Sequence, residues 1–200
     1  QSADVTSLPE PESYGDALLA LLGHPSIASK RWVWEQYDHV VQTQTETLPG
    51  RGDAALLAVR EAGGRRIAAT TDCNPRFVYL DPYKGAQLAI AEAARNLSCV
   101  GAVPAATTDC LNFPSPEKPE GFWQFTQAVN GMAAACDFFK TPVVSGNVSF
   151  YNETHEGAMY TTPTVGMLGV LPAGVEPVGL AFQNNLELIY VLRPKGWESE

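Results

Sequence analysis

Three polar triplets follow short apolar runs in this sequence, and each contains a side chain that can bind a metal ion. They are "TTD" ending at Asp72, "TTD" ending at Asp109 and "SGN" ending at Asn147. The apolar runs are typical of buried strands, so each triplet is expected where a strand ends. Aspartate and asparagine are also common at turns, because their side chains bond to nearby backbone. Each triplet alone is therefore compatible with a turn or with a ligand site.

Taken together, the triplets favour a ligand site. The side-chain oxygens of Asp72, Asp109 and Asn147 are hard ligands of the kind that magnesium takes when it also binds the phosphates of a nucleotide. Gly146 lets a phosphate approach the backbone closely, because it has no β-carbon. The hydroxyl of Ser149 can donate a hydrogen bond to a phosphate or a substrate oxygen. These five residues form the predicted site.

This magnesium hypothesis depends on topology, because strands at 67–72 and 104–109 must end at the same edge of a sheet. The polar stretch "DCNPRFVYLDPYKG", residues 72–85, follows the first of these strands. Loops of this length are often functional. Arg76 and Lys84 in it can neutralise phosphate, or can be solvated surface cations. No Ser-His-Asp order, GxxxxGK[ST] or GxGxxG motif occurs, and the three histidines are scattered, so we predict no general base.

Helical and strand patterns alternate along the chain. Apolar residues at steps of three and four predict helices, and short apolar runs bounded by glycine or polar residues predict strands. We expect helices at 13–23, 29–41, 85–101 and 117–140, and strands at 54–61, 65–72, 104–113, 141–152, 159–171 and 186–194.

The order of these elements from Arg65 onward is β-α-β-α-β-β. It predicts an α+β fold, in which a mixed four-stranded sheet carries both long helices on one face. Gly63 and Gly64 predict a hairpin between the first two strands. The polar loop "ETHEGA" predicts a second hairpin between strands 141–152 and 159–171, and hence at least one antiparallel neighbour.

The composition limits the partners of the chain. Its 200 residues suffice for one domain with a sizeable core. A formal net charge of −9 argues against binding to nucleic acid or to an acidic membrane surface. No apolar run approaches the ~18 residues of a membrane span, and the first residues lack a signal-peptide pattern. The four cysteines lie in or beside apolar runs without metal-ligand spacing, which predicts buried reduced thiols and a cytoplasmic domain.

Five longer motifs resemble one enzyme family in order and spacing. They are "SIASKRWVWEQYDHVVQT", "TTDCNPRFVYLDPYKG", "AEAARNLSCVGAVPAATTDCLNF", "PEKPEGFWQF" and "TPVVSGNVSFYNET". They are similar to the second half of phosphoribosylformylglycinamidine synthase, a synthetase of purine biosynthesis. The resemblance implies a linker and short helix at 1–25, a synthetase N-terminal-like domain at 26–174, and at 175–200 the start of a connection to a C-terminal domain.

The resemblance also implies a fold and a reaction. The fold would be like the N-terminal domain of aminoimidazole ribonucleotide synthetase, in which two mixed sheets meet to form a barrel. The reaction would be that of a carbon–nitrogen ligase. ATP activates the amide oxygen of formylglycinamide ribonucleotide, and ammonia from a glutaminase subunit or domain displaces phosphate to give the amidine. The first-half domain and the C-terminal domain of the same enzyme are the implied partners.

The resemblance assigns roles to the residues of the predicted site. Asp109 and Gly146 fall on positions that contact ATP, Asn147 on a magnesium ligand and Ser149 on a substrate contact. Asp72 matches the acidic position that sister synthetases use towards metal and phosphate. The catalytic histidine of the family belongs to its first half. We therefore assign no catalytic residue to this chain and expect it to be inactive alone.

One departure from the family pattern follows "DCLNF", where Pro114 and Ser115 replace the usual Gly-Asn. Proline fixes φ and removes a backbone N–H donor, so the backbone of this loop is expected to take a different direction. Two alternatives stay open. One is a sister synthetase or kinase for aminoimidazole ribonucleotide, selenophosphate or thiamine phosphate, against which "KRWVWEQYDHVVQT" and "DCLNF" argue. The other is a scaffold with a structural nucleotide. A lone half-barrel would expose an apolar sheet face, which predicts homodimerisation.

Overall fold

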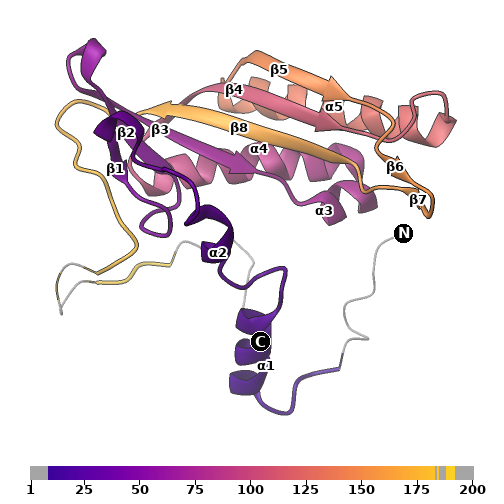
Figure 1. Cartoon of the computed structure of the whole chain (residues 1–200), viewed down its shortest axis with the longest axis horizontal. Coiled ribbons are helices and arrows are strands. Elements are labelled where there is room, and N and C mark those ends of the chain that lie inside the picture. The colour runs from indigo at the N-terminus through magenta and orange to yellow at the C-terminus, as the bar shows by residue number, and fades with distance from the viewer. Residues whose placement is uncertain (1–8, 183, 185–187, 192–200) are drawn as a thin grey trace.

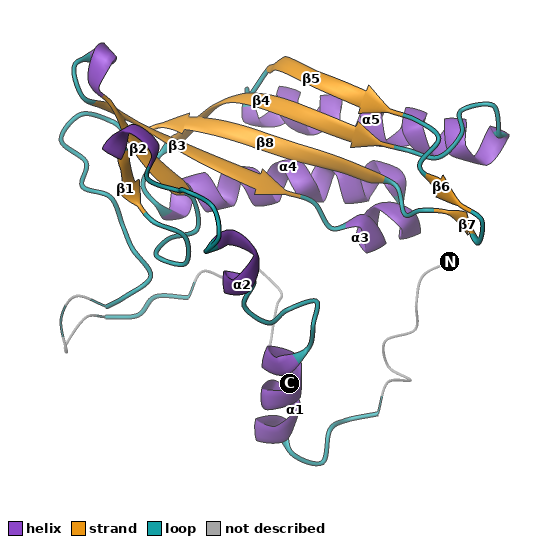
Figure 2. Ribbon diagram, in the orientation of Figure 1, coloured by secondary structure: helices purple, strands orange, loops and turns teal. Residues whose placement is uncertain are grey.

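The computed structural model describes residues 9–182, 184 and 188–191. Their helices and strands follow one another as labelled in Figure 1 and coloured by type in Figure 2. In chain order they are α1 (Tyr14–Gly23), α2 (Arg31–Trp34), β1 (Thr45–Thr47), β2 (Ala55–Val59), β3 (Arg65–Asp72), α3 (Pro75–Leu80), α4 (Pro82–Cys99), β4 (Val103–Asn112), α5 (Pro119–Phe139), β5 (Val143–Ser149), β6 (Glu153–Thr154), β7 (Gly157–Ala158) and β8 (Thr162–Val170).

The described strands form a six-stranded sheet in the order β1-β2-β3-β8-β4-β5. The pair β4–β5 is parallel, and every other neighbouring pair is antiparallel. The predicted mixed sheet is therefore confirmed. The predicted four strands form its β3-β8-β4-β5 part, and the predicted hairpin of β2 and β3 adds a fifth strand, with β1 as the sixth. These strands form an open sheet and not a closed barrel.

The second predicted hairpin is wrong. β8 does not pair with β5 but lies between β3 and β4, while the segment after β5 forms a separate ribbon of β6 and β7. The physical reason lies in β8 itself, where alternate residues from Pro163 to Gly169 are buried. Val165 and Met167 are almost inaccessible, so this strand requires a central place under the helices and not an edge.

The long helices α4 and α5 both lie behind the sheet in Figure 1, as predicted, and they pack against each other. Their close approach requires small residues. A β-carbon on Gly131 of α5 would lie 2.1 Å from the carbonyl oxygen of Tyr83 in α4. The face of the sheet opposite the helices, here called the open face, exposes apolar side chains. Val103 is 58%, Leu168 44% and Val170 44% exposed.

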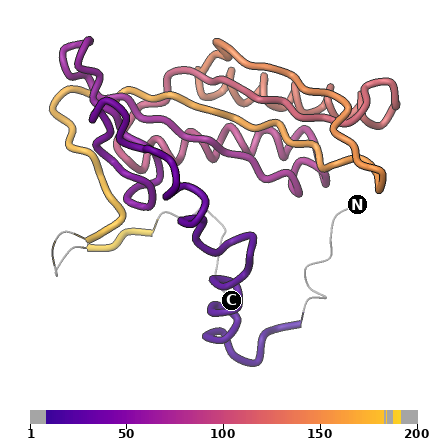
Figure 3. The backbone as a smooth tube through the Cα atoms, in the orientation of Figure 1, coloured from indigo at the N-terminus to yellow at the C-terminus, as the bar shows by residue number. Residues whose placement is uncertain are grey.

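The N-terminal segment differs from its prediction in one respect. The helix expected at 13–23 forms as α1, but the helix expected at 29–41 is reduced to the four residues of α2. Figure 3 shows α1 standing away from the sheet. The side chains of Trp32 and Tyr37 are 72% and 66% exposed, so the apolar stripe has nothing to pack against. A helix this short is not stable without such packing.

Three further differences concern local structure. The loop expected at 72–85 contains α3, which is capped by Asn74, whose side chain accepts the backbone N–H of Arg76. The strand expected at 186–194 falls partly outside the described residues, and residues 188–191 form no strand. The cysteines are free thiols, but Cys99 and Cys110 are exposed rather than buried. No helix in the described part of the chain is long and apolar enough to span a membrane.

Candidate nucleotide and metal site

Strands β3, β4 and β5 run in the same direction and end at one edge of the sheet. β3 and β4 are both antiparallel to β8, which lies between them, and β5 is parallel to β4. Asp72 at the end of β3 and Ser149 at the end of β5 therefore lie towards the same edge (Figure 2). The topology that the magnesium hypothesis required is present, although β3 and β4 are not direct neighbours.

Asp72, Asp109 and Gly146 lie in one row across the sheet. Asp72 and Asp109 both pair with Val165, from opposite sides, and Gly146 pairs with Asp109. Neighbouring strands are about 4.8 Å apart, so the backbones of the two aspartates are roughly 10 Å apart. Among the described residues, no group of three or more His, Cys, Asp and Glu side chains could hold a metal ion.

The side chains of the predicted site divide between the two faces of the sheet. Successive residues of a strand point to opposite faces. Asp109 shares the helix side with Thr107, which bonds to Thr141 and to Cys136 of α5. Asn147 is the next residue after Gly146, so it points to the open face. The three oxygen ligands expected to converge are therefore separated: two aspartates on the helix side and Asn147 opposite.

The carboxylate of Asp72 is tied to α4. The Nδ2 of Asn96 donates to Oδ1 of Asp72 over 2.7 Å. The other oxygen, Oδ2, is buried and has no hydrogen-bond partner among the described residues. Asn96 was not predicted from the sequence, although a polar side chain on the largely alanine inner face of α4 is a usable signal. The contact makes Asp72 part of the helix–sheet junction.

The carboxyl group of Asp109 occupies the space beside Gly146. A β-carbon on Gly146 would lie 2.4 Å from Oδ1 and 2.9 Å from Oδ2 of Asp109. Gly146 is thus required by a side chain, not by a positive φ. Burial raises the pKa of the Asp109 carboxyl. The backbone of Gly146 and the carboxyl group of Asp109 lie side by side and form what is here called the polar corner. It is accessible beside the edge strand β5.

Asn147 and the half-buried Ser149 are two of the polar residues of β5, together with the exposed Ser145. Asn147 is exposed, and its side chain makes no hydrogen bond with any described residue. The hydroxyl of Ser149 is contacted by Nδ2 of Asn152 at 3.4 Å, a weak contact that leaves it able to donate. Beside them on the open face, the hydroxyls of Thr108 and Ser145 are 2.8 Å apart. This surface presents hydroxyl and amide groups to a ligand.

Residues 51–171 match the family model "AIR synthase related protein, N-terminal domain". The chain belongs to this family. Its resemblance to phosphoribosylformylglycinamidine synthase is also confirmed. It is 54% identical over 189 residues to subunit PurL of Moorella thermoacetica, covering 94% of this chain and 26% of the relative. It is 56% identical over 201 residues to PurL of Deinococcus radiodurans, covering 97% and 27%. The chain thus spans about a quarter of these relatives.

Solved structures of the same family share the fold. Thermotoga maritima PurL complexed with ATP has a TM-score of 0.62 and 32% identity, covering 72% of this chain and 23% of that chain. The same protein complexed with FGAR has a TM-score of 0.61 and 34% identity, with the same coverage. AaThiL, complexed with AMPPCP and TMP, has a TM-score of 0.50 at 19% identity, a likeness of fold alone.

The loop that departs from the usual family pattern is held by Glu153. The backbone N–H of Ser115 donates to Oε1 of Glu153 over 2.9 Å, and Nζ of Lys118 donates to Oε2 over 2.7 Å. The hydrogen bond from Lys118, together with that from Ser115, lowers the pKa of Glu153. The amide of Ser115 is therefore engaged by the protein and not free for a ligand. No pattern in the sequence indicated this contact.

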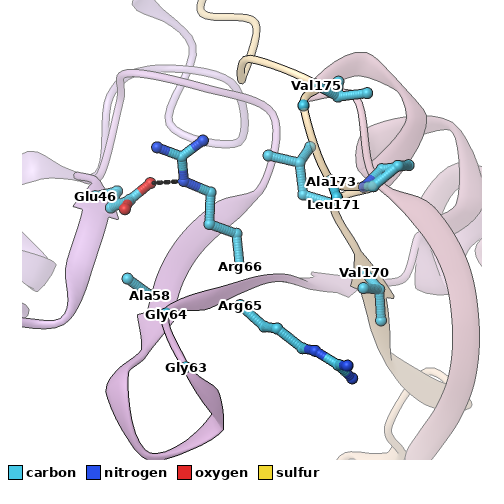
Figure 4. A pocket seen from close by; sticks show the side chains of 12 residues that line it. Glu46, Ala58, Gly63, Gly64, Arg65, Arg66, Val170, Leu171, Ala173 and Val175 are labelled. Carbon is cyan, nitrogen blue, oxygen red and sulfur yellow. Dashed lines mark ion pairs between the residues drawn. The ribbon is translucent and has the colours of Figure 1, made fainter.

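Two cavities at the ends of β3 contain arginines, and neither includes the polar corner. One, of about 680 Å³, lies where β3 begins and β8 ends. In it the guanidinium of Arg66 donates to Glu46 over 2.9 Å, as Figure 4 shows. The other, of about 740 Å³, lies beyond the end of β3 and includes Arg76. Lys84, the second cation predicted to neutralise phosphate, is exposed on α4 and lines neither cavity.

Proposed function

We propose that this chain is part of a phosphoribosylformylglycinamidine synthase and forms one wall of a site for ATP and formylglycinamide ribonucleotide. The observation that carries the proposal is the polar corner of Asp109 and Gly146 beside the exposed edge strand β5, with Asn147 adjacent to it on the open face. It is supported by similarity to PurL proteins over about a quarter of their length, one of them solved with ATP and with FGAR.

The roles follow from what each residue can offer. Asn147 would supply an amide oxygen to magnesium, an ion that usually keeps several waters and also binds substrate phosphates. Magnesium, when bound, neutralises phosphate charge during transfer. Gly146 allows a phosphate close to the backbone, and Asp109 beside it contacts the nucleotide. Ser149 donates to the ribonucleotide substrate. The donor set fits a metal held mainly by its nucleotide.

Asp72 fits a metal role less well than Asn147. Its Oδ1 accepts from Asn96, and its Oδ2 is buried on the helix side of the sheet. The Asp72 carboxylate can bind a metal only after its hydrogen bond with Asn96 is broken. In the proposal Asp72 therefore remains a candidate metal ligand that depends on rearrangement, and Asn147 is the primary one.

The proposed partners follow from the open face. Exposed Val103, Leu168 and Val170 would be covered by the first-half domain of the same enzyme, giving the barrel of two sheets. Residues 1–200 alone would instead form homodimers through this face. A C-terminal domain would complete the site, and a glutaminase subunit or domain would supply ammonia, in the cytoplasm. Amidine formation by residues 1–200 alone is not expected, because the catalytic histidine lies elsewhere in the family.

Calorimetric titration of residues 1–200 with ATP tests the site. We expect binding that requires magnesium and is lost in Asn147→Ala. The matched control is Asn130→Ala, which removes an equally exposed amide from α5. Binding that is unchanged in Asn147→Ala, or equally weakened in both variants, would contradict the proposal.

A scaffold with a structural nucleotide is the second candidate, favoured by the apolar open face. The two functions differ in the full-length enzyme. If the nucleotide takes part in the reaction, Asn147→Ala lowers kcat of amidine formation. If it is structural, the same variant lowers the melting temperature and leaves kcat of the remaining folded enzyme unchanged.

A further inference from the structure

A cavity of about 740 Å³ lies between the N-terminal segment and the end of β3. Residues 21–27 contribute one wall, with His24 and Ser26. Residues 73–76 contribute the opposite wall, with Arg76, and Tyr160 lines it from the segment before β8. Its volume is within the usual range for small-molecule sites, about 300–1,000 Å³. It is separate from the Gly146–Asn147 corner, because β8 and β4 lie between β3 and β5.

Arg76 and His24 supply donors to this cavity, and the amide oxygen of Asn74, which also lines it, already accepts the backbone N–H of Arg76. No aspartate or glutamate lines it, although the chain carries a net charge of −9. The guanidinium of Arg76 makes no ion pair or hydrogen bond with any described residue. Nδ1 of His24 accepts the N–H of Ser26 over 3.1 Å, so the neutral imidazole carries its proton on Nε2 and can donate it. An anion is the ligand that this set can satisfy.

The rest of the cavity is apolar. Leu21, Ile27 and Pro75 line it beside the ring of Tyr160. That ring is held by Tyr79, with centroids 5.1 Å apart and planes inclined by 50°. A free inorganic anion would leave these apolar side chains exposed to water. A ligand with an anionic group at one end and an apolar or ring portion at the other would cover both parts of the cavity.

The two walls of the cavity are held together by packing. No hydrogen bond or ion pair joins residues 21–27 to residues 73–76 or to Tyr160, all of which lie within the described ranges. A ligand that contacts both Arg76 and His24 would therefore join this segment to the sheet. Binding of this ligand should therefore protect the N-terminal segment from proteolysis, in addition to giving a signal in calorimetry.

We propose that this cavity binds a small phosphomonoester, with Arg76 and His24 on the phosphate and the apolar wall against the remainder. Guanidinium and imidazole are suited to a phosphate, and Tyr160 to a sugar or base ring. Sugar phosphates and nucleoside monophosphates share this chemistry. The inference does not rest on the function proposed for the β5 corner.

Titration of residues 1–200 with ribose 5-phosphate, AMP and inorganic phosphate, followed by calorimetry, tests the proposal. We expect one of the two esters to bind more tightly than inorganic phosphate, and Arg76→Ala to weaken it at least tenfold. Arg95→Ala, which removes an exposed cation from α4 outside the cavity, should change nothing. No ester binding, inorganic phosphate binding as tightly as both esters, or equal loss in both variants would overturn the assignment.

Limited trypsin digestion provides a second readout, because Lys30 and Arg31 follow the N-terminal wall directly. The bound ester should slow cleavage there in the unmodified chain and not in Arg76→Ala. Ester binding lost in Asn147→Ala but kept in Arg76→Ala would place the ligand at the β5 corner and overturn the proposal. Failure of ATP binding at that corner would leave the ester result unaffected, so the two proposals fail separately.

Discussion

Gly146 and Asp109 share one space: a β-carbon on Gly146 would lie 2.4 Å from Oδ1 of Asp109. The two residues face each other on the parallel strands β5 and β4. The absence of a side chain at 146 therefore determines where the carboxyl group of Asp109 lies. Even the replacement of Gly146 by alanine, the smallest possible substitution, should therefore disturb the polar corner.

Gly146→Ala should displace that carboxyl group. The carboxyl can rotate away, so we expect a loss of about 1 kcal/mol in the free energy of unfolding, at the low end for overpacking. Urea denaturation measures it. In an Asp109→Ala background the loss should disappear, because the contacted atoms are gone.

Gly131→Ala is the comparison, since its β-carbon would meet the backbone of Tyr83 at 2.1 Å. Backbone cannot rotate away, and we expect about 3 kcal/mol or more. If the two glycine variants were equally destabilised, the distinction between side-chain and backbone contacts would be incorrect.

Asp109→Asn should stabilise the chain at neutral pH. Burial raises the pKa of Asp109, so the folded state holds this proton more tightly than the unfolded state. The stability linked to the proton is present below the unfolded pKa and is lost as pH rises through the folded pKa. The group is partly exposed, so the effect should be small. Urea denaturation of both proteins should give a difference at pH 7 that vanishes near pH 3. A less stable variant at pH 7 would refute this.

Glu153→Gln should remove a pH dependence of the opposite sign. The pKa of Glu153 is lowered by Lys118 and Ser115, so the stability it contributes is present above the ordinary glutamate pKa and is lost as pH falls through its folded value. The protection factor of the Ser115 amide, which compares its hydrogen exchange with that of an unfolded amide at the same pH, should fall on acidification in the unmodified chain. In Glu153→Gln the protection factor should already be low at neutral pH, and unchanged protection there would show that Lys118 and the carboxylate do not hold the loop.

Asn96→Ala should destabilise the helix–sheet junction. It leaves the carboxylate of Asp72 without its one hydrogen bond in a site where Oδ2 is already unpartnered. We expect a loss of about 1–2 kcal/mol in the free energy of unfolding, because a half-buried carboxylate loses its hydrogen-bond partner among the described residues. Asn130→Ala, on the exposed side of α5, should cost less than about 0.5 kcal/mol. Equal losses would mean that Asp72 does not depend on Asn96.

Local patterns predicted the elements, and distant contacts decided how they assemble. β3 has the predicted bounds, 65–72, and α4 and α5 lie within a few residues of theirs, because apolar spacing is a local property. The insertion of β8 could not be found this way, since its neighbours β3 and β4 are far away in sequence. The helix expected at 29–41 failed for the same reason, because its stability depended on a surface that the local pattern does not specify.

The position of the candidate residues towards one edge of the sheet was predicted correctly, but the faces to which their side chains point were not predicted. Alternation along a strand already implies that Gly146 and Asn147 point in opposite directions. Placing Asp109 opposite Asn147 also requires the register of β4 against β5, which local patterns do not specify. The bond between Asp72 and Asn96 could not have been derived, because it depends on how α4 lies across β3.

The central place of β8 has a consequence for the folding of the chain during its synthesis on the ribosome. β3 and β4 each leave one edge without its neighbour until residues 162–170 have been synthesised. During that interval the nascent chain lacks the central strand of its sheet. The unpaired edges of β3 and β4 can then pair incorrectly with other strands. The sheet is complete only when β8 lies between β3 and β4, so its pairing depends on the strand that is synthesised last among those described.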